Sequence, residues 1–350
     1  MSETIRISHP SEFLAIVPYV LGYHPEASIV AAAFGRIEEK LLFMLRFDLP
    51  DDSAEARELV SQMTGMLARN GCERALLVGY GPGSRVTPVI DAATDMLATA
   101  GIDLMDALRA EDNRYWSYGC SDPGCCSPDG VPYNVSECCA ASLAVVAGLV
   151  ARPDRAAFVS MLDPVTGQER EEITLATRTQ CDHARSLVET AIARYWYQEG
   201  LDRVDDALRA VAEGRTIPAD QLAWLGVLLT ALFVRDGAMT YIERYDDDTH
   251  IRLWTDLVRR VDPAFVAAPA ALLAFVAFRS GNGALARIAV ERSLAADPRY
   301  RLALLTREAL DWGVPPSAAG GMDCANMGDA ILRSVDHYPH LAAPTLPEGW

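Results

Sequence analysis

Residues 74–80, with the sequence RALLVGY, form a continuous apolar run that is typical of a central β-strand covered on both faces. A Gly-Pro-Gly-Ser turn at residues 81–84 follows, and residues 86–100 then show the apolar spacing of a helix. Residues 103–109 and 114–118 have strand patterns around a turn. This alternation of strand, helix and strand predicts an α/β domain whose helices cover a sheet.

The residues before this strand extend the same domain. Residues 28–34 and 41–47 are short β-rich runs, which predicts a hairpin. Helices are predicted at residues 10–19 and 54–70, where apolar side chains fall on one face. We therefore expect a mixed sheet flanked by helices over residues 1–135, ending in a cysteine-rich loop.

Strand patterns disappear after residue 135, and long amphipathic or buried helical patterns follow. We therefore place an all-α domain at residues 136–312 and a tail rich in Gly, Pro and Ala at residues 313–350. Helices of the all-α domain are predicted at residues 137–151, 172–198, 201–213, 219–236 and 249–261.

One segment of the helical domain, Ala270–Leu304, resembles a single tetratricopeptide repeat. Gly281, Ala286 and the pair Asp297-Pro298 take the turn, packing and terminal positions of such a repeat. A helical hairpin of this kind must stack on a neighbour to bury its apolar face. An ordinary helical bundle with an accidental Asp-Pro period is the alternative that the pattern leaves open.

The composition excludes several classes of protein. The chain of 350 residues has 31 basic and 48 acidic residues, a formal charge of −17, which argues against binding to nucleic acid or an anionic membrane. Lys40 is the single lysine, which excludes a Walker-type phosphate loop. The longest uncharged apolar runs of the chain, at residues 138–151 and 263–278, are shorter than the roughly 20 residues of a membrane-spanning helix. We expect a cytoplasmic protein.

Five of the eight cysteines lie between residues 120 and 139. Turns rich in Pro and Gly around the first three could direct several sulfur atoms inward, as a zinc or iron–sulfur site requires. However, the spacing contains no C-x2-C pair, and adjacent cysteines are poor joint ligands of one ion. We therefore predict no cofactor and mostly buried structural thiols, with a zinc site and a redox pair as alternatives. These residues are Cys120, Cys125, Cys126, Cys138 and Cys139.

If a metal binds, Cys120, Cys125 and one of the pair Cys138 and Cys139 are the expected first ligands. The last two begin an apolar helix, where buried thiols are common.

A second candidate site lies between the central strand and the helix that follows. It consists of Gly79, Gly81, Gly83 and Ser84, and backbone N–H groups at such a helix start can hold an anion. The glycines do not match G-x-G-x-x-G, and Pro82 removes one donor. A plain tight turn is the alternative to ligand binding.

A third candidate site consists of polar residues at predicted strand ends, where ligands gather in open α/β sheets. His24, Arg46, Asp48 and Arg114 are the candidate catalytic residues, and Tyr80 lies at a neighbouring strand end. Two of them, Arg46 and Asp48, are two positions apart and therefore share one face of a strand. An ion pair that closes the sheet edge is the alternative.

Several segments together resemble an uncharacterised actinobacterial family, described as a domain of unknown function, over about residues 5–316. The resemblance implies no activity, substrate or cofactor, but it raises the rank of the residues in the matching segments. These segments are VPYVLGYHPEASIV at 17–30, RFDLP at 46–50, RYWSYGCSDPGCCSPDG at 114–130, FVRDGAMTYI at 233–242, HIRLWTDLVRRVDP at 250–263, APAALLAFVAFRSGNGALARIAVERSLAADPRY at 268–300 and GVPP at 313–316.

The sequence favours a binding or regulatory protein over an enzyme. Helical hairpins could offer a groove to another protein, and the α/β domain could hold a small ligand or ion. An enzyme is the first alternative, with Asp48, His24 or a loop cysteine at the strand ends acting as acid, base or nucleophile. A purely structural protein is the second.

Overall fold

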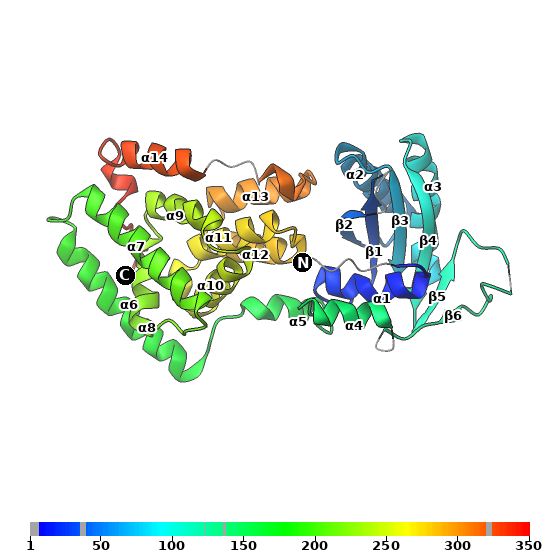
Figure 1. The fold of residues 1–350 in the computed structure, drawn as a ribbon, viewed down its shortest axis with the longest axis horizontal. Helices are drawn as coiled ribbons and strands as arrows, with labels where there is room; N and C mark the ends of the chain where they lie inside the picture. The colour runs from blue at the N-terminus through cyan, green and yellow to red at the C-terminus, as the bar shows by residue number, and fades with distance from the viewer. Residues whose placement is uncertain (1–6, 36–39, 123, 136–137, 320–323) are drawn as a thin grey trace. The chain divides into compact units, whose positions relative to one another are not determined.

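The computed structural model of the chain contains two compact units, Met1–Ser160 and Met161–Trp350 (Figure 1). The first is a mixed sheet with helices and the second is helical, so the predicted fold class is confirmed. The predicted domain boundary after residue 135 falls inside the first unit. The structure describes all residues except 1–6, 36–39, 123, 136–137 and 320–323.

The first unit is built on a six-stranded sheet with the strand order β2-β1-β3-β4-β5-β6. Strands β3 and β4 are parallel, and every other neighbouring pair is antiparallel. The predicted hairpin and central strand are present, whereas the short β6 was not predicted. The strands are β1 Ser28–Phe34, β2 Leu41–Asp48, β3 Arg74–Tyr80, β4 Asp103–Glu111, β5 Arg114–Ser117 and β6 Val131–Pro132.

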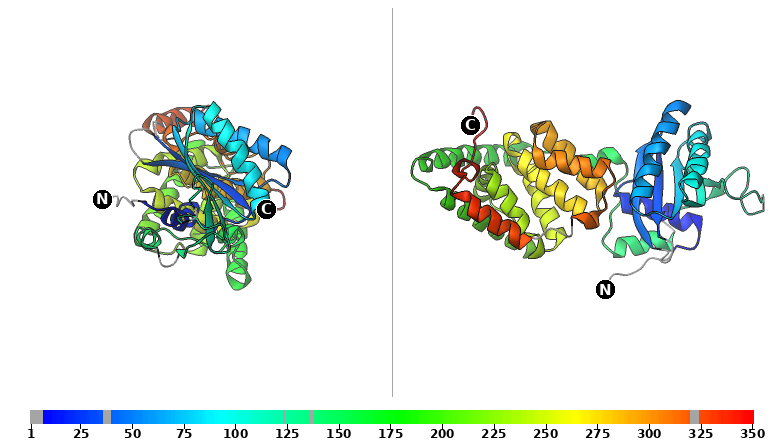
Figure 2. Two further views of the ribbon diagram at one scale, coloured as in Figure 1. Left: turned by 90° about the vertical axis from the view of Figure 1, so that its right-hand side faces the viewer. Right: turned by 90° about the horizontal axis from the view of Figure 1, so that it is seen from above.

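Helices cover both faces of this sheet (Figure 2). Helices α2 (Ser53–Arg69) and α3 (Gly83–Thr99) enclose the main core with one face, and α1 (Pro10–Leu21) lies over the other. Helix α4 (Cys139–Val146) packs against α1, and the short α5 (Arg155–Val159) follows. The sequence places residues 136–312 in the helical domain, whereas α4 lies within the first unit and its alanines are buried there.

The second unit contains nine α-helices among its described residues. Two long predicted helices are wrong, because each is broken. Residues 172–198 divide between α6 and α7 at a β-branched stretch that includes Val188, Thr190 and Ile192. The helices are α6 Gly167–Leu187, α7 Ala193–Ala212, α8 Ala219–Leu228, α9 Leu232–Ala238, α10 Asp247–Arg260, α11 Ala267–Arg279, α12 Gly283–Ala296, α13 Arg301–Asp311 and α14 Cys324–Val335.

The second broken helix bends by 111° between α8 and α9. The hydroxyl of Thr230 donates to the carbonyl oxygen of Val227 over 2.7 Å at this point and competes with the helical hydrogen-bond ladder. Short 3-10 helices lie at Ser160–Leu162, Met239–Glu243, Pro263–Phe265, Pro316–Ala318 and Pro339–Leu341.

A helical hairpin is present where the tetratricopeptide resemblance was seen. Helices α11 and α12 pack together, and Gly281 takes the turn between them with a φ of 82°. The side chain of Ala286 is fully buried. The likeness to a tetratricopeptide repeat itself stays a prediction.

The C-terminal tail contains more structure than its composition suggests. Within residues 313–350, Ile331 and Val335 of α14 join a buried cluster with Tyr197 and Phe233. The end of the chain is therefore part of the core of the second unit.

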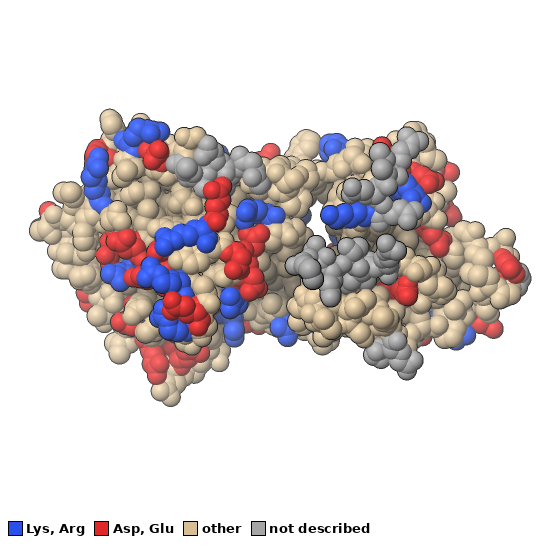
Figure 3. Space-filling view, viewed as in Figure 1, with Lys and Arg blue, Asp and Glu red and all other residues tan. Residues whose placement is uncertain are grey.

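The surface of the second unit carries mixed charge, with acidic and basic side chains interspersed on the face seen in Figure 3. Asp205 pairs with Arg209 at 2.6 Å and with Arg244 at 2.9 Å. Among the described residues, no single helix combines the length and the apolar composition needed to cross a membrane.

Candidate metal centre

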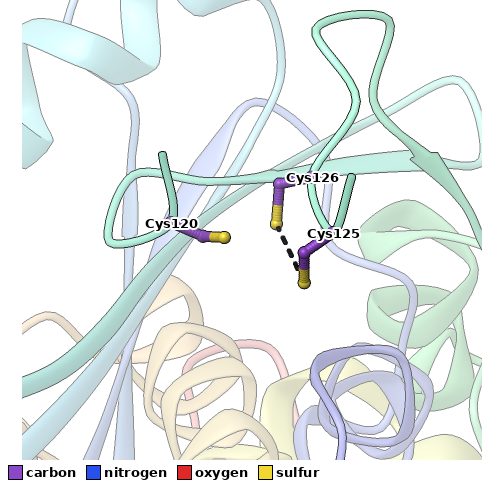
Figure 4. A group of neighbouring side chains, drawn as sticks. All are labelled: Cys120, Cys125 and Cys126. Carbon is purple, nitrogen blue, oxygen red and sulfur yellow. Dashed lines mark hydrogen bonds between the residues drawn. The ribbon is translucent and has the colours of Figure 1, made fainter. Parts of the chain in front are cut away.

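Three cysteines converge in the loop between β5 and β6. The sulfur atoms of Cys120, Cys125 and Cys126 all lie within 4.8 Å of one another, and those of the last two are 4.0 Å apart. Figure 4 shows the thiol of Cys120 pointing toward the other two. A tetrahedral zinc ion with Zn–S bonds of about 2.3 Å holds its sulfur ligands about 3.8 Å apart. The three sulfur atoms are therefore close to the spacing of a ligand set.

The backbone around Asp122 produces this convergence. Its carbonyl oxygen accepts the N–H groups of Cys125 at 3.1 Å and Cys126 at 2.8 Å. Its carboxylate accepts the N–H of Gly124 at 2.8 Å. These three bonds close a tight turn that brings both later cysteines back toward Cys120.

Two of the thiols, those of Cys120 and Cys126, differ in acidity. A backbone hydrogen bond from Asp122, followed by one from the thiol of Cys126, lowers the pKa of Cys120. The same thiol contact with Cys120 raises the pKa of Cys126 to about 12. Hydrogen bonds to a charged form favour that form. Cys120 therefore becomes a thiolate before Cys126, and Cys126 retains its proton as the donor.

The return of the loop is fixed to β5. The Nε of Arg114 donates to the carbonyl oxygen of Asp129 over 2.7 Å, and the indole of Trp116 donates to that of Pro128 over 2.9 Å. Gly130 has a φ of 81°, and a Cβ there would lie 2.6 Å from the Trp116 ring. Arg114, a candidate catalytic residue by sequence, thus anchors the cysteine loop.

Tyr115 of β5 lies beside the sulfur cluster on the opposite face of the strand from Trp116. Burial, and then the charges of Cys126 and Cys125, raise the pKa of its phenol. Its ring contacts Tyr133, with a centroid distance of 6.1 Å. Tyr115 is therefore near enough to the thiols for their charge to act on its phenol, and Tyr133 packs beside it.

One expectation about the cysteines is wrong. The five loop and helix cysteines were expected to be mostly buried, but Cys125 and Cys139 are exposed and the other three are half-buried. The expected ligand set stays a prediction: it includes Cys138 or Cys139 as third ligand, whereas the sulfur group in the loop contains Cys126. Adjacent cysteines share the site because the Asp122 turn directs both side chains to one side.

The strand-end residues do not form one cluster. Arg46 and Asp48 form the expected ion pair at the end of β2, with an N···O distance of 2.6 Å. Tyr80 ends β3 with a buried hydroxyl, and the N–H of His24 donates to the carbonyl oxygen of Arg152 at 3.0 Å. Arg46, Asp48 and Tyr80 share one sheet edge. Arg114 lies at the same edge, opposite Glu111 at the end of β4, but its side chain bonds the cysteine loop.

Packing accounts for part of the glycine-rich turn. A Cβ at Gly79 would lie 2.2 Å from the Cγ1 of Val86, so the glycine permits the close approach of α3 to the sheet. A Cβ at Gly83 would lie 3.3 Å from the guanidinium of Arg109. That guanidinium pairs with Glu111 at 2.6 Å. Anion binding at this turn stays a prediction, and sequence reasoning missed the arginine beside it.

The fold and the cysteine loop define an α/β unit with a candidate thiolate site, followed by a helical unit. The family model described as a domain of unknown function, DUF4192, matches residues 10–317. The chain therefore belongs to this family, as the sequence resemblance implied. No curated protein and no solved structure matches the chain.

Proposed function

We propose that this protein is a cytoplasmic metal-binding protein that holds a zinc ion between Cys120, Cys125 and Cys126. The observation that carries the proposal is the convergence of the three sulfur atoms within 4.8 Å. Thiolates favour zinc and other thiophilic ions over magnesium or calcium. Three protein ligands leave the fourth zinc position to water or to an external ligand.

The different acidities of Cys120 and Cys126 support the same proposal. The N–H of Asp122 stabilises the negative sulfur of Cys120 before any ion arrives. An incoming zinc ion then replaces the proton that Cys126 shares with it, so binding releases protons. The end of the loop at residues 128–129 is already bonded to β5. A bound ion would in addition join Cys120, at the start of the loop, to Cys125 and Cys126.

The metal content of the full chain tests this proposal. Protein purified without chelator should contain about one zinc ion per chain, and Cys120→Ser, Cys125→Ser and Cys126→Ser should each lower that ratio severalfold. Cys139→Ser is the matched control, because this cysteine is exposed but lies outside the sulfur group. Unchanged zinc content in all three variants would contradict the proposal.

A redox pair is the second candidate, because Cys126 lies within 4.0 Å of Cys125 and also contacts Cys120. Thiol titration of the denatured protein separates the two functions. All eight thiols should react if the site binds zinc, whereas two would be missing if a disulfide forms. Binding of a partner protein by the helical unit, and catalysis at the strand ends, stay predictions.

A further inference from the structure

Four buried side-chain donors in the first unit have no hydrogen-bond partner among the described residues. One is the hydroxyl of Thr64 on α2, and the other three lie on the sheet: the hydroxyl of Ser28, the Nε of Arg46 and the hydroxyl of Tyr80. The residue Ser28 is fully buried, and Tyr80 is 8% exposed. Most buried polar groups in native proteins have a partner, so a group of three without one requires an explanation.

Strand register places the three donors on one face of the sheet. Ser28 of β1 lies directly opposite Asp48 of β2 and Tyr80 of β3. Arg46 lies opposite Val30, two residues along β1 from Ser28. Residues directly opposite one another, and residues two apart on a strand, project to the same side. The three side chains therefore leave the same face of three adjacent strands.

This face is the one that α1 covers, because the alternate residues belong to the core under α2 and α3. Ile29 and Leu77 alternate with the donors and lie in that core. Strands β2 and β3 end at this edge and β1 begins there, since β1 is antiparallel to both. The edge also holds the carboxyl ends of the parallel strands, where ligands of open α/β sheets bind.

The guanidinium of Arg46 is held in place by its other nitrogens. Its Nη1 pairs with Asp48 at 2.6 Å, and its Nη2 donates to the carbonyl oxygen of Glu26 at 3.4 Å. The side chain of Arg46 is 15% exposed, whereas that of Asp48 is 84% exposed. One N–H of the fixed cation thus remains inside the protein with no acceptor among the described residues.

We propose that this row of donors binds an oxyanion group, either the phosphate or the carboxylate of a small molecule. Each of the three groups can donate a hydrogen bond, and oxyanion oxygens are acceptors only. Arg46 supplies the positive charge, and hydrogen bonds from arginine to an oxyanion are the strong kind. Ser28 on the middle strand and Tyr80 on the next strand add neutral donors beside the arginine.

None of the three donors belongs to the cysteine loop, so the proposal does not depend on whether that loop binds a metal. It also explains why Ser28, a polar residue, opens a strand whose next five residues are buried and apolar.

Calorimetric titration of the full chain with inorganic phosphate, and separately with acetate, at constant ionic strength tests the proposal. Wild-type protein should bind at least one of them, and the tighter of the two identifies the oxyanion class. Ser28→Ala and Tyr80→Phe should each weaken binding about three- to tenfold, the range of one neutral hydrogen bond. Arg46→Gln should weaken it more than about tenfold, because a charged donor is lost.

Two controls keep the result specific. Arg85→Gln removes another arginine from the same sheet edge, one that bonds the carbonyl oxygen of Leu49 at 2.6 Å, and should leave binding unchanged. Ser293→Ala removes a buried hydroxyl that already donates to the carbonyl oxygen of Ala267 at 2.8 Å. It should lower the melting temperature, whereas Ser28→Ala without ligand should not.

The proposal is overturned if wild-type protein binds neither anion. It is also overturned if Ser28→Ala and Tyr80→Phe bind as tightly as wild type. Both variants remove atoms that have no protein partner among the described residues, so they should fold even where Arg46→Gln does not.

Discussion

The backbone N–H of Cys126 donates to the carbonyl oxygen of Asp122 over 2.8 Å. Together with the two other hydrogen bonds of the Asp122 turn, this bond brings Cys126 back toward Cys120. The proposed zinc site therefore depends on turn geometry as much as on the presence of thiols.

Asp122→Ala should weaken zinc binding without removing a ligand. The substitution deletes the carboxylate that accepts the N–H of Gly124 and loosens the turn. We expect a loss of affinity of about tenfold, as for one hydrogen bond to a charged group. Competition with a chromophoric chelator measures it, and Asp129→Ala, in the same loop, is the control. Equal affinities of the two variants would contradict this role of the turn.

Gly79→Ala should destabilise the first unit, because the new methyl group would overlap the side chain of Val86 at 2.2 Å. Overpacking of this kind costs about 1–3 kcal/mol of unfolding free energy. The double variant with Val86→Ala should recover part of the loss. Urea denaturation of wild type, both single variants and the double variant measures the coupling. If the losses of unfolding free energy in the two single variants simply add up in the double variant, the contact with Val86 is not the cause of the destabilisation.

Ala286→Leu should destabilise the second unit by about 1–3 kcal/mol, because this alanine is fully buried between packed helices. Ala295→Leu, at an exposed position of the same helix, is the matched control and should have little effect. Thermal unfolding compares the two. An unchanged melting temperature for Ala286→Leu would refute the packing role of this position.

His250 should make the stability of the second unit sensitive to acid. Burial lowers the pKa of its imidazole, and the nearby charge of Arg279 lowers it further. The carbonyl oxygen of Tyr241 and the carboxylate of Asp247 raise the pKa, but burial has the largest effect. The unfolded chain, with a histidine pKa of about 6.5, then binds more protons than the folded one. The contribution of His250 is therefore complete above about pH 6.5 and is lost as the pH falls below that value.

Urea denaturation at about pH 7.5 and about pH 5.5 measures this effect. The free energy of unfolding should fall more steeply with acid in wild type than in His250→Gln. The exposed residue His337 provides the control variant, His337→Gln. Equal slopes for wild type and His250→Gln would show that burial of this histidine is not linked to pH.

Most strands of the sheet could be predicted from the sequence, because a buried strand such as residues 74–80 has a local apolar signature. The break between α6 and α7 could not, because the polar and apolar pattern of residues 172–198 is continuous across it. Tertiary packing decides such breaks, and local propensity only permits them.

The candidate sites also contain features that the sequence predicts and features that only the folded structure shows. The cysteine loop was visible from its composition, but the choice of Cys126 over Cys138 depends on a backbone turn that no spacing rule describes. The pairing of Arg46 with Asp48 was visible from strand alternation. The role of Ser28 was not, because its lack of a partner is a property of the folded sheet.

Zinc K-edge X-ray absorption of the full chain, purified without chelator, tests the proposed metal centre most directly. The account predicts three sulfur scatterers at about 2.3 Å and one lighter atom at about 2.0 Å, as in a site with three cysteines. The Cys126→Ser variant should lose one sulfur scatterer, while Cys139→Ser should match wild type. Protein without bound zinc, or zinc surrounded only by nitrogen and oxygen, would contradict the account.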